Sequence, residues 1–222
     1  MAIDHRPEPV PSVVEGAIDL PRLYPILDAS CLPDERALFQ FVEELLSAGV
    51  TLLQYRNKQG SPRQMLSQAR QLRRIAGAGV RLIMNDRADL CLAAGFDGVH
   101  LGQDDLPPED ARHIVEKPLW MGVSTHNPEQ LRRADQTGAD YLAIGPVFAT
   151  GSKANPDPVV GLDGVRAARA LTRKPLVAIG GITRSNARLV IEAGADAVAV
   201  ISDLLLDPRR AVEEFNRRIA KT

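Results

Sequence analysis

Two short polar segments with carboxylates follow neighbouring apolar runs in the stretch 82–105. Asn85 and Asp86 end the first run, and Asp105 closes the Gly-Gln-Asp-Asp segment after the second. If both runs are parallel strands, their carboxyl ends meet at one rim, where proteins of this class place their sites. Carboxylates gathered there indicate a hard cation, and a hard cation indicates a phosphorylated substrate.

A second polar segment, Gln-Tyr-Arg-Asn-Lys at 54–58, follows another apolar run. In extended backbone, alternate residues share a side, so Gln54, Arg56 and Lys58 point together. Two cations on one side suit a polyanion, although a solvated strand end or ion pairs with nearby acids would also explain them. Mg²⁺ binds through one or two carboxylates plus substrate phosphates. A diphosphate held by Arg56, Lys58 and a cation on Asp86 and Asp105 accounts for the whole cluster.

A phosphate site is predicted near the end of the chain. Gly180 and Gly181 precede a predicted helix, and Ile201-Ser202 ends the next apolar run. Backbone N–H groups at a helix start bind phosphate, and barrels often do so after their last two strands. A plain tight turn is the alternative; with Ser202 opposite, the phosphate site is favoured.

No obvious nucleophile–base pair stands among these polar residues. His100 and His126 lie at or near strand ends, where a neutral imidazole with one local hydrogen bond is the commoner case. Asp104 is expected to point away from the face of Asp105, because neighbouring residues of an extended segment alternate. We therefore expect a site that binds anions and a cation rather than one that transfers protons.

The elements that must position these residues form a regular series. Residues 1–20 are proline-rich and without periodicity, which predicts a flexible N-terminal tail before a single catalytic domain over 21–222. Eight apolar runs alternate with segments of helical periodicity, and the runs are 23–28, 51–56, 81–86, 98–101, 120–124, 141–147, 175–180 and 197–202. Eight such units predict an α/β protein with a single (β/α)₈ TIM barrel. A doubly wound open sheet is the competitor, disfavoured by the count and by the lack of a G-x-G-x-x-G motif after the first run.

A short repeat supports the count. Glycines at 49, 95, 138 and 194 each stand between a predicted helix and the next apolar run, and aspartate follows two residues after the last three. A glycine there is expected to take the left-handed conformation that ends a helix. We also expect Thr183 to cap the helix that ends at Gly194.

Composition excludes several other classes. The formal net charge of −1 gives no general attraction to nucleic acid or to membranes, and no apolar run reaches the ~18 residues that a membrane helix needs. The acidic, proline-rich start is unlike a signal peptide. Cys31 and Cys91 form no C-x-x-C pair and are read as buried thiols, which predicts a cytoplasmic protein.

Together these motifs resemble the thiamine phosphate synthase family over essentially residues 21–205. They are QYRNK (54–58), NDRADL (85–90), GVHLGQDDL (98–106), GVSTHN (122–127), GPVF…T-x-S-K (145–153), AIGGI (178–182) and AVAVIS (197–202). The resemblance implies a (β/α)₈ barrel and a transferase. Such an enzyme joins 4-amino-2-methyl-5-(diphosphooxymethyl)pyrimidine to 4-methyl-5-(2-phosphooxyethyl)thiazole with Mg²⁺, giving thiamine phosphate and diphosphate by early loss of the diphosphate.

The resemblance also implies site residues. Metal ligands would be Asp86 and Asp105. Catalytic roles would fall to Arg56, Lys58, Ser124 and Lys153. The pyrimidine diphosphate would be held by Gln54, Arg56, Lys58 and Asn85, with Ser124 and Lys153 facing the pyrimidine or its diphosphate. The thiazole phosphate would contact Thr150, Ser152, Gly181, Ile201 and Ser202. Tyr55, Asn57 and Gly151 are further expected substrate-binding residues.

Three alternatives stay open. A thiazole tautomerase of the same superfamily would have no use for the diphosphate cluster, and another phosphate-binding barrel enzyme would not explain Arg56 and Lys58. A non-catalytic binding protein for thiamine precursors would bind both ligands without releasing diphosphate. Small phosphorylated molecules are the expected binding partners. The chain could also assemble into a homo-oligomer, which the sequence does not decide.

Overall fold

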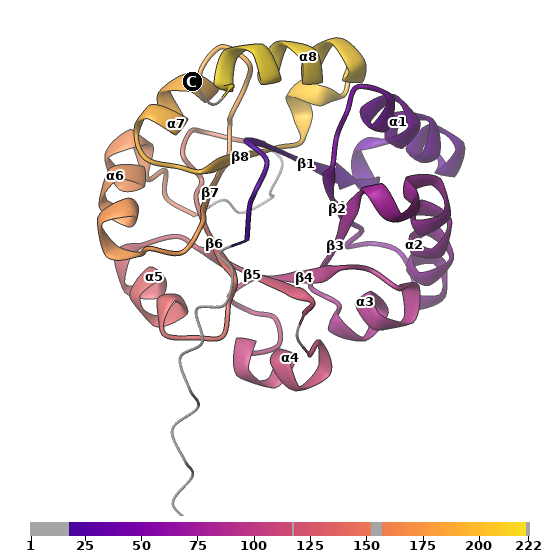
Figure 1. Ribbon diagram of the computed structural model, residues 1–222, viewed down its shortest axis with the longest axis horizontal. Helices are drawn as coiled ribbons and strands as arrows, with labels where there is room; N and C mark the ends of the chain where they lie inside the picture. Colours follow the sequence, from indigo (N-terminus) through magenta and orange to yellow (C-terminus); the bar gives the residue numbers. More distant parts are fainter. Residues whose placement is uncertain (1–17, 117, 152–156, 221–222) are drawn as a thin grey trace, which may run out of the picture.

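The strands close into a ring in the computed structural model, which describes residues 18–116, 118–151 and 157–220 (Figure 1). Eight parallel strands pair in sequence order, and β8 pairs with β1 to complete the barrel. The strands are β1 Leu23–Asp28, β2 Leu52–Arg56, β3 Arg81–Asn85, β4 Gly98–Leu101, β5 Trp120–Thr125, β6 Tyr141–Ile144, β7 Leu176–Ile179 and β8 Ala197–Val200. The predicted single (β/α)₈ barrel is therefore confirmed, and the open sheet is excluded.

A helix follows each strand on the outside of the ring (Figure 1). The helices are α1 Glu35–Ser47, α2 Pro62–Ala76, α3 Ala88–Ala94, α4 Pro108–Ile114, α5 Pro128–Asp135, α6 Gly161–Leu171, α7 Ala187–Glu192 and α8 Pro208–Ile219, with 3₁₀ turns η1 Ala29–Cys31, η2 Gly77–Gly79 and η3 Ser202–Leu204. Side-chain oxygens of Asp34, Ser61, Asn127 and Asp207 accept backbone N–H bonds at four helix starts, as N-caps do. Among these helices none is long and apolar enough to cross a membrane.

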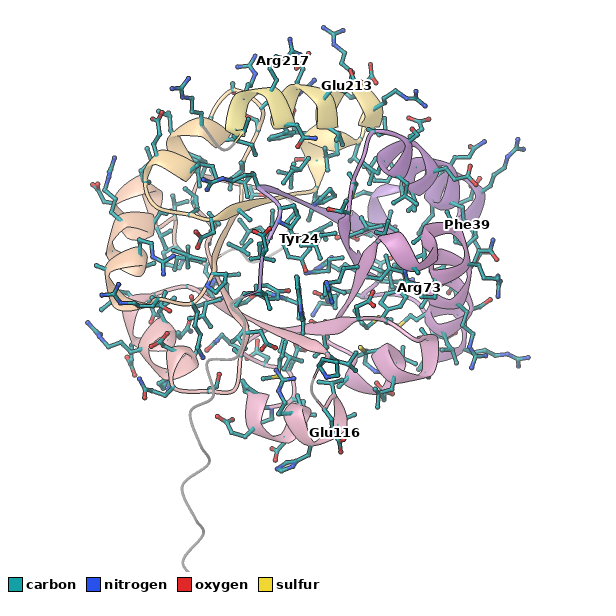
Figure 2. The ribbon with its side chains drawn as sticks, in the orientation of Figure 1. Tyr24, Phe39, Arg73, Glu116, Glu213 and Arg217 are labelled. Atoms are coloured by element: carbon teal, nitrogen blue, oxygen red, sulfur yellow. The ribbon has the colours of Figure 1, made fainter. Side chains whose placement is uncertain are left out.

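The core has two layers. One fills the space between strands and helices, and the other fills the barrel interior with Tyr24, Ile26, Ile83, Tyr141 and neighbouring aliphatic side chains. Figure 2 shows Tyr24 within the ring, whereas Glu213 and Arg217 of α8 point outward. Because both faces of each strand are covered, the strands read as continuous apolar runs.

The packed body begins before the predicted domain boundary at residue 21. Leu20 is buried in the interior cluster, and Ile18 packs partly against the same cluster. Residues 1–17 of the predicted tail lie outside the described residues. Apolar side chains at 18 and 20 thus join the barrel rather than a tail.

The aspartates of the sequence repeat close the amino-terminal rim of the barrel. Each aspartate accepts a hydrogen bond from a backbone N–H of the preceding strand and forms an ion pair with an arginine of a helix. The same arginine donates hydrogen bonds to backbone carbonyls at the end of its own helix or in the loop that follows. The pairs are Arg73–Asp97, Arg112–Asp140 and Arg169–Asp196. The repeat therefore marks an arginine–aspartate clasp, by which we mean this ion pair with its backbone hydrogen bonds. The clasp recurs in every second β/α unit, on the rim opposite the site.

The predicted left-handed glycines are found at three of the four positions. Gly49, Gly95 and Gly194 have φ of 88°, 68° and 113°, but Gly138 has no positive φ. The prediction at Gly138 is wrong because α5 ends at Asp135, so the chain has already left the helix before it reaches this glycine.

Candidate active site

A cavity of about 430 Å³ opens at the carboxyl ends of the strands. Side chains or backbone of eleven predicted site residues line it: Gln54, Arg56, Lys58, Asn85, Asp86, Asp105, Ser124, Thr150, Gly181, Ile201 and Ser202. They come from β2 through β8 and the segments that follow these strands. The barrel thus brings together residues that are far apart in the sequence, such as Gln54 and Ser202, which are separated by 148 positions.

The two cations of the QYRNK segment are both held by carboxylates. Lys58 Nζ lies 2.5 Å from Asp86 Oδ2, and Arg56 pairs with Asp28 at the end of β1. The Asp28 side chain is only 1% exposed and also accepts bonds from the Ser30 backbone and hydroxyl, so it is rigidly placed. Ion pairs with nearby acids therefore account for both cations, and Asp28 holds the guanidinium of Arg56 at the rim of the cavity.

Asp86 is held in an unusual backbone conformation beside a second carboxylate. Its φ is 63°, in the left-handed region that aspartate tolerates better than most residues. Burial and the neighbouring Asp105 carboxyl raise the pKa of Asp86 to about 6, against the opposing effect of Lys58. Asp105 is itself fixed by the backbone N–H of Gly102, 2.7 Å from its Oδ2.

This pair fits a magnesium ion better than a zinc-type site. Two close carboxylates repel each other, so a cation between them would relieve the repulsion that raises the Asp86 pKa. Among the described residues there is no cluster of three or more histidine, cysteine, aspartate or glutamate side chains that could hold a metal. Mg²⁺ needs only one or two carboxylates when substrate phosphates and water supply the remaining ligands.

A chain of hydrogen bonds runs through the barrel interior, and all of its members except Tyr141 line the cavity. Gln54 Nε2 donates to the Tyr24 hydroxyl at 3.0 Å, and that hydroxyl lies 2.9 Å from the Tyr141 hydroxyl. The Tyr141 hydroxyl lies 3.0 Å from His100 Nδ1, and His100 Nε2 lies 2.8 Å from Ser124 Oγ. Burial lowers the pKa of His100 to about 4, with a smaller opposing effect of Asp105, so the imidazole is neutral. The expectation of a neutral His100 is thereby supported, but its ring makes two hydrogen bonds rather than one.

The glycine turn after β7 is not the start of a helix. Helix α7 begins only at Ala187 and has six residues, so the predicted cap at Thr183 is wrong: Asn186 occupies that position, and its Oδ1 accepts the Thr183 N–H. Gly180 and Gly181 instead turn the chain with φ of 101° and 63°. A Cβ on Gly181 would lie 2.5 Å from the Ala149 carbonyl, so the turn also requires glycine for space.

Free backbone donors surround this turn. The N–H groups of Gly181, Ile182 and Ser202 have no acceptor among the described residues, and Ser202 begins the short 3₁₀ turn η3 after β8. Donors of this kind at a glycine turn form an anion-binding concavity. The phosphate site at this corner stays a prediction, and it would use N–H groups of a glycine turn rather than those of a helix start.

The long loop after β6 reaches the cavity at both of its described ends. Thr150 and Asp157 line the cavity, and Asp157 Oδ2 lies 3.5 Å from Nε2 of His126, whose Nδ1 bonds the Gly145 carbonyl. Gly151 is exposed and does not line the cavity. The predicted contacts of Ser152 and Lys153 lie outside the described residues.

Tyr55 and Asn57 point away from the cavity, contrary to the prediction of substrate contacts for them. The Tyr55 hydroxyl donates to Gln68 Oε1 of α2 at 2.5 Å, and Asn57 Nδ2 bonds the same oxygen at 3.1 Å. Asn57 Oδ1 accepts the Gly60 N–H, which shapes the loop that carries Lys58. Alternation along β2 explains the result: Gln54 and Arg56 face inward, so Tyr55 faces the helices.

Asp104 lies nearer to the cavity than strand alternation predicts. It is exposed, as expected for a solvated residue, but it lies at the edge of the cavity beside Asp105, because residues 103–104 form a turn in which strand alternation no longer applies. Sequence reasoning also missed Tyr24 and Tyr141 as parts of the site. The signal that could have identified them is a tyrosine hydroxyl at an inward-facing position of an otherwise apolar strand.

Comparisons with known proteins agree with this geometry. The sequence model of a family described as thiamine monophosphate synthase matches residues 23–204. A thiamine-phosphate synthase of Koribacter versatilis is 63% identical to this chain, and the match covers 90% of this chain and 96% of the relative. A thiamine-phosphate synthase of Chloroflexus aurantiacus is 47% identical, and the match covers 82% of this chain and 83% of the relative.

Solved structures give the same result. A thiamine phosphate pyrophosphorylase from Pyrococcus furiosus superimposes with a TM-score of 0.79 at 34% identity, covering 89% of this chain and 95% of that one. Barrel enzymes of other function, such as the tryptophan synthase α-subunit of Legionella pneumophila at 21% identity and a TM-score of 0.64, share the fold alone. With its cavity, its paired carboxylates and these matches, the chain belongs to the thiamine monophosphate synthase family, a family of transferase enzymes.

Proposed function

We propose that this chain couples 4-amino-2-methyl-5-(diphosphooxymethyl)pyrimidine to 4-methyl-5-(2-phosphooxyethyl)thiazole, forming thiamine phosphate and diphosphate. The observation that carries the proposal is one cavity with polar groups suited to anions at two separate corners. Arg56, Lys58 and the carboxylate pair stand at the first corner, and the glycine turn with Ser202 stands at the second.

The first corner suits a diphosphate. Arg56 is held at the cavity rim by buried Asp28, so its guanidinium can offer two parallel hydrogen bonds without first being ordered. Asp86 and Asp105 would hold the Mg²⁺ ion, which would neutralise charge on the departing diphosphate. The Lys58 ammonium, now on Asp86, is half-exposed and is free to move onto a phosphate oxygen.

The second corner suits a single phosphate ester. The N–H groups of Gly181, Ile182 and Ser202 supply donors without a cation, and the Ser202 hydroxyl adds one more. A monoester carries less charge than a diphosphate, so backbone donors are adequate for it. We therefore expect the thiazole phosphate on the β7–β8 side and the pyrimidine diphosphate on the β2–β4 side.

The chemistry needs positioning and charge neutralisation more than proton transfer. The bond between the pyrimidine methylene carbon and the diphosphate oxygen breaks first, and its electron pair leaves with diphosphate. The thiazole nitrogen then donates its lone pair to the methylene carbon, and the new C–N bond completes thiamine phosphate. The lone pair is already free, so no general base is required, and the buried His100, whose pKa is lowered to about 4, has no proton to take in this reaction.

The test is a coupling assay with both phosphorylated substrates and Mg²⁺, in which thiamine phosphate and diphosphate are measured together. We expect the two products in equal amounts. Saturating substrates without either product would contradict the proposal. Conversion of the thiazole phosphate alone to an isomer would favour the tautomerase alternative, and tight binding of both ligands without diphosphate release would favour a binding protein. A cytoplasmic location and a homo-oligomer stay predictions.

A further inference from the structure

A single side chain fixes the glycine turn after β7. Asn186 Nδ2 donates to the Gly181 carbonyl at 3.0 Å, and Asn186 Oδ1 accepts the Thr183 N–H at 2.8 Å, so the peptides on both sides of Ile182 are held. Because C=O and N–H point in opposite directions across a trans peptide, the Ile182 N–H is turned away from Asn186. Gly181 and Ile182 line the cavity, whereas Asn186 does not. The Asn186 amide therefore orients the turn from outside the cavity.

An ion pair joins this turn to the segment after β8. Arg184 donates from its backbone N–H and from Nε to Asp203 Oδ2, at 2.7 and 3.0 Å. Asp203 directly follows Ser202, whose N–H has no acceptor among the described residues. The Arg184 and Asp203 side chains are 27% and 19% exposed, and neither lines the cavity. The pair thus sets the separation between the free N–H groups of the two segments.

The charges around Arg184 make it a partner of the protein rather than a phosphate ligand. Its guanidinium pairs with two carboxylates, Asp203 and Glu214 of α8, at 3.0 and 3.1 Å. Movement of Arg184 onto a phosphate would leave the largely buried Asp203 carboxylate without its cation, which is costly. Lys58 shows the contrast, because it lines the cavity, is 51% exposed and pairs with one carboxylate.

We propose that Asn186 and the Arg184–Asp203 pair are positioning residues for the thiazole phosphate. The inference rests on the proposed function and identifies residues that touch no substrate but set the geometry of one corner. Donors on two separate loops bind a phosphate well only if they already converge, because ordering a loop at the moment of binding costs affinity. The diphosphate corner is built from β2–β4 and the segments that follow them, so it contains none of these residues. Their loss should therefore weaken one substrate and spare the other.

Steady-state kinetics of Asn186→Ala and Asp203→Ala test the inference. Each variant should raise the KM for the thiazole phosphate by about tenfold, while the KM for the pyrimidine diphosphate and kcat stay within about twofold of the parent. General damage to the barrel would instead change all three constants. Asp203→Asn keeps the shape of the side chain and removes its charge, so it takes the place of Asp203→Ala if that variant does not fold, and the same KM should rise.

Glu192→Ala is the matched control, since it also removes a carboxylate that pairs with an arginine, Arg188, but one on the exposed face of α7. It should leave all three constants within about twofold of the parent. A parental KM for the thiazole phosphate in both Asn186→Ala and Asp203→Ala would overturn the inference. A lower KM in Asp203→Ala would also overturn it, because Arg184, once released, would then contact the phosphate itself.

A binding measurement separates this inference from the proposed function. Calorimetric titration of the thiazole phosphate in the presence of Mg²⁺ and diphosphate needs no turnover, and the Kd should be about tenfold weaker in Asn186→Ala than in the parent. If the parent forms thiamine phosphate and the variants keep its constants, only the positioning role is wrong. If the parent binds the thiazole phosphate but forms no product, the proposed function fails and the Kd values still decide the positioning role. A parent that neither binds it nor forms product would overturn both.

Discussion

His100 should make the folded protein less stable as the pH falls below 6.5, and the size of the effect follows from its burial. The ring is buried between the Tyr141 hydroxyl and Ser124, and burial lowers its pKa from 6.5 to about 4. In the unfolded chain the same imidazole would take up a proton near its ordinary pKa. Below pH 6.5 the unfolded state therefore binds more protons than the folded state, and protonation favours unfolding.

The magnitude is set by the separation of the two pKa values. Linkage gives a loss of about 2 kcal/mol in the free energy of unfolding between pH 7 and pH 5, and about 3 kcal/mol by pH 4. The loss levels off below the folded-state pKa. Asp105 opposes the shift but is the smaller influence, so the direction is clear.

Urea denaturation of the parent and of His100→Gln at several pH values isolates this contribution. Other groups also titrate over this range, so the difference between the two proteins is the quantity to follow. Glutamine has no proton to gain, and the parent should lose about 2 kcal/mol relative to it between pH 7 and pH 5. Parallel curves over that range would show that His100 is not held neutral. Direct NMR titration of the His100 ring in the parent gives the same answer if the variant does not fold.

Three further predictions concern the carboxylates and the phosphate corner. Asp86→Asn removes a charge but keeps a residue that tolerates the left-handed backbone, so the coupling rate should fall by about tenfold or more and the reaction should require more Mg²⁺. An unchanged Mg²⁺ dependence would place the metal elsewhere. Ser202→Asp sets a carboxylate against the proposed thiazole phosphate and should raise the KM for that substrate by about tenfold while changing the pyrimidine KM little; the opposite pattern in steady-state kinetics would exchange the two corners. In urea denaturation, Asp140→Asn should lower the free energy of unfolding by about 2–3 kcal/mol and Asp196→Asn by about 1 kcal/mol, because the two aspartate side chains are 8% and 47% exposed. An equal or reversed order would contradict a stabilising role of the arginine–aspartate clasp that depends on its burial.

Local features of the chain were sufficient to predict the barrel. Apolar runs between helical segments and glycines after helix ends are properties of short stretches, and eight such units have few ways to bury both faces of their strands. For the same reason the strand-end residues Arg56, Asp86 and Ser202 could be placed at one rim. Where local geometry departed from a regular element, the prediction failed: the helix after Gly181 begins later than expected, at Ala187.

The partners of the site residues were decided by tertiary structure alone. Arg56 pairs with Asp28 across two neighbouring strands, and Tyr24 meets Tyr141 from 117 positions away. Such contacts depend on the register and closure of the whole barrel, which brings inward-facing residues of β1, β4 and β6 into one interior. The sequence by itself determined which residue types reach the rim, because strand ends are local. Only the closed fold decided which of them are free to bind a ligand and which are held by one another, because hydrogen bonds and ion pairs require atoms to meet in space.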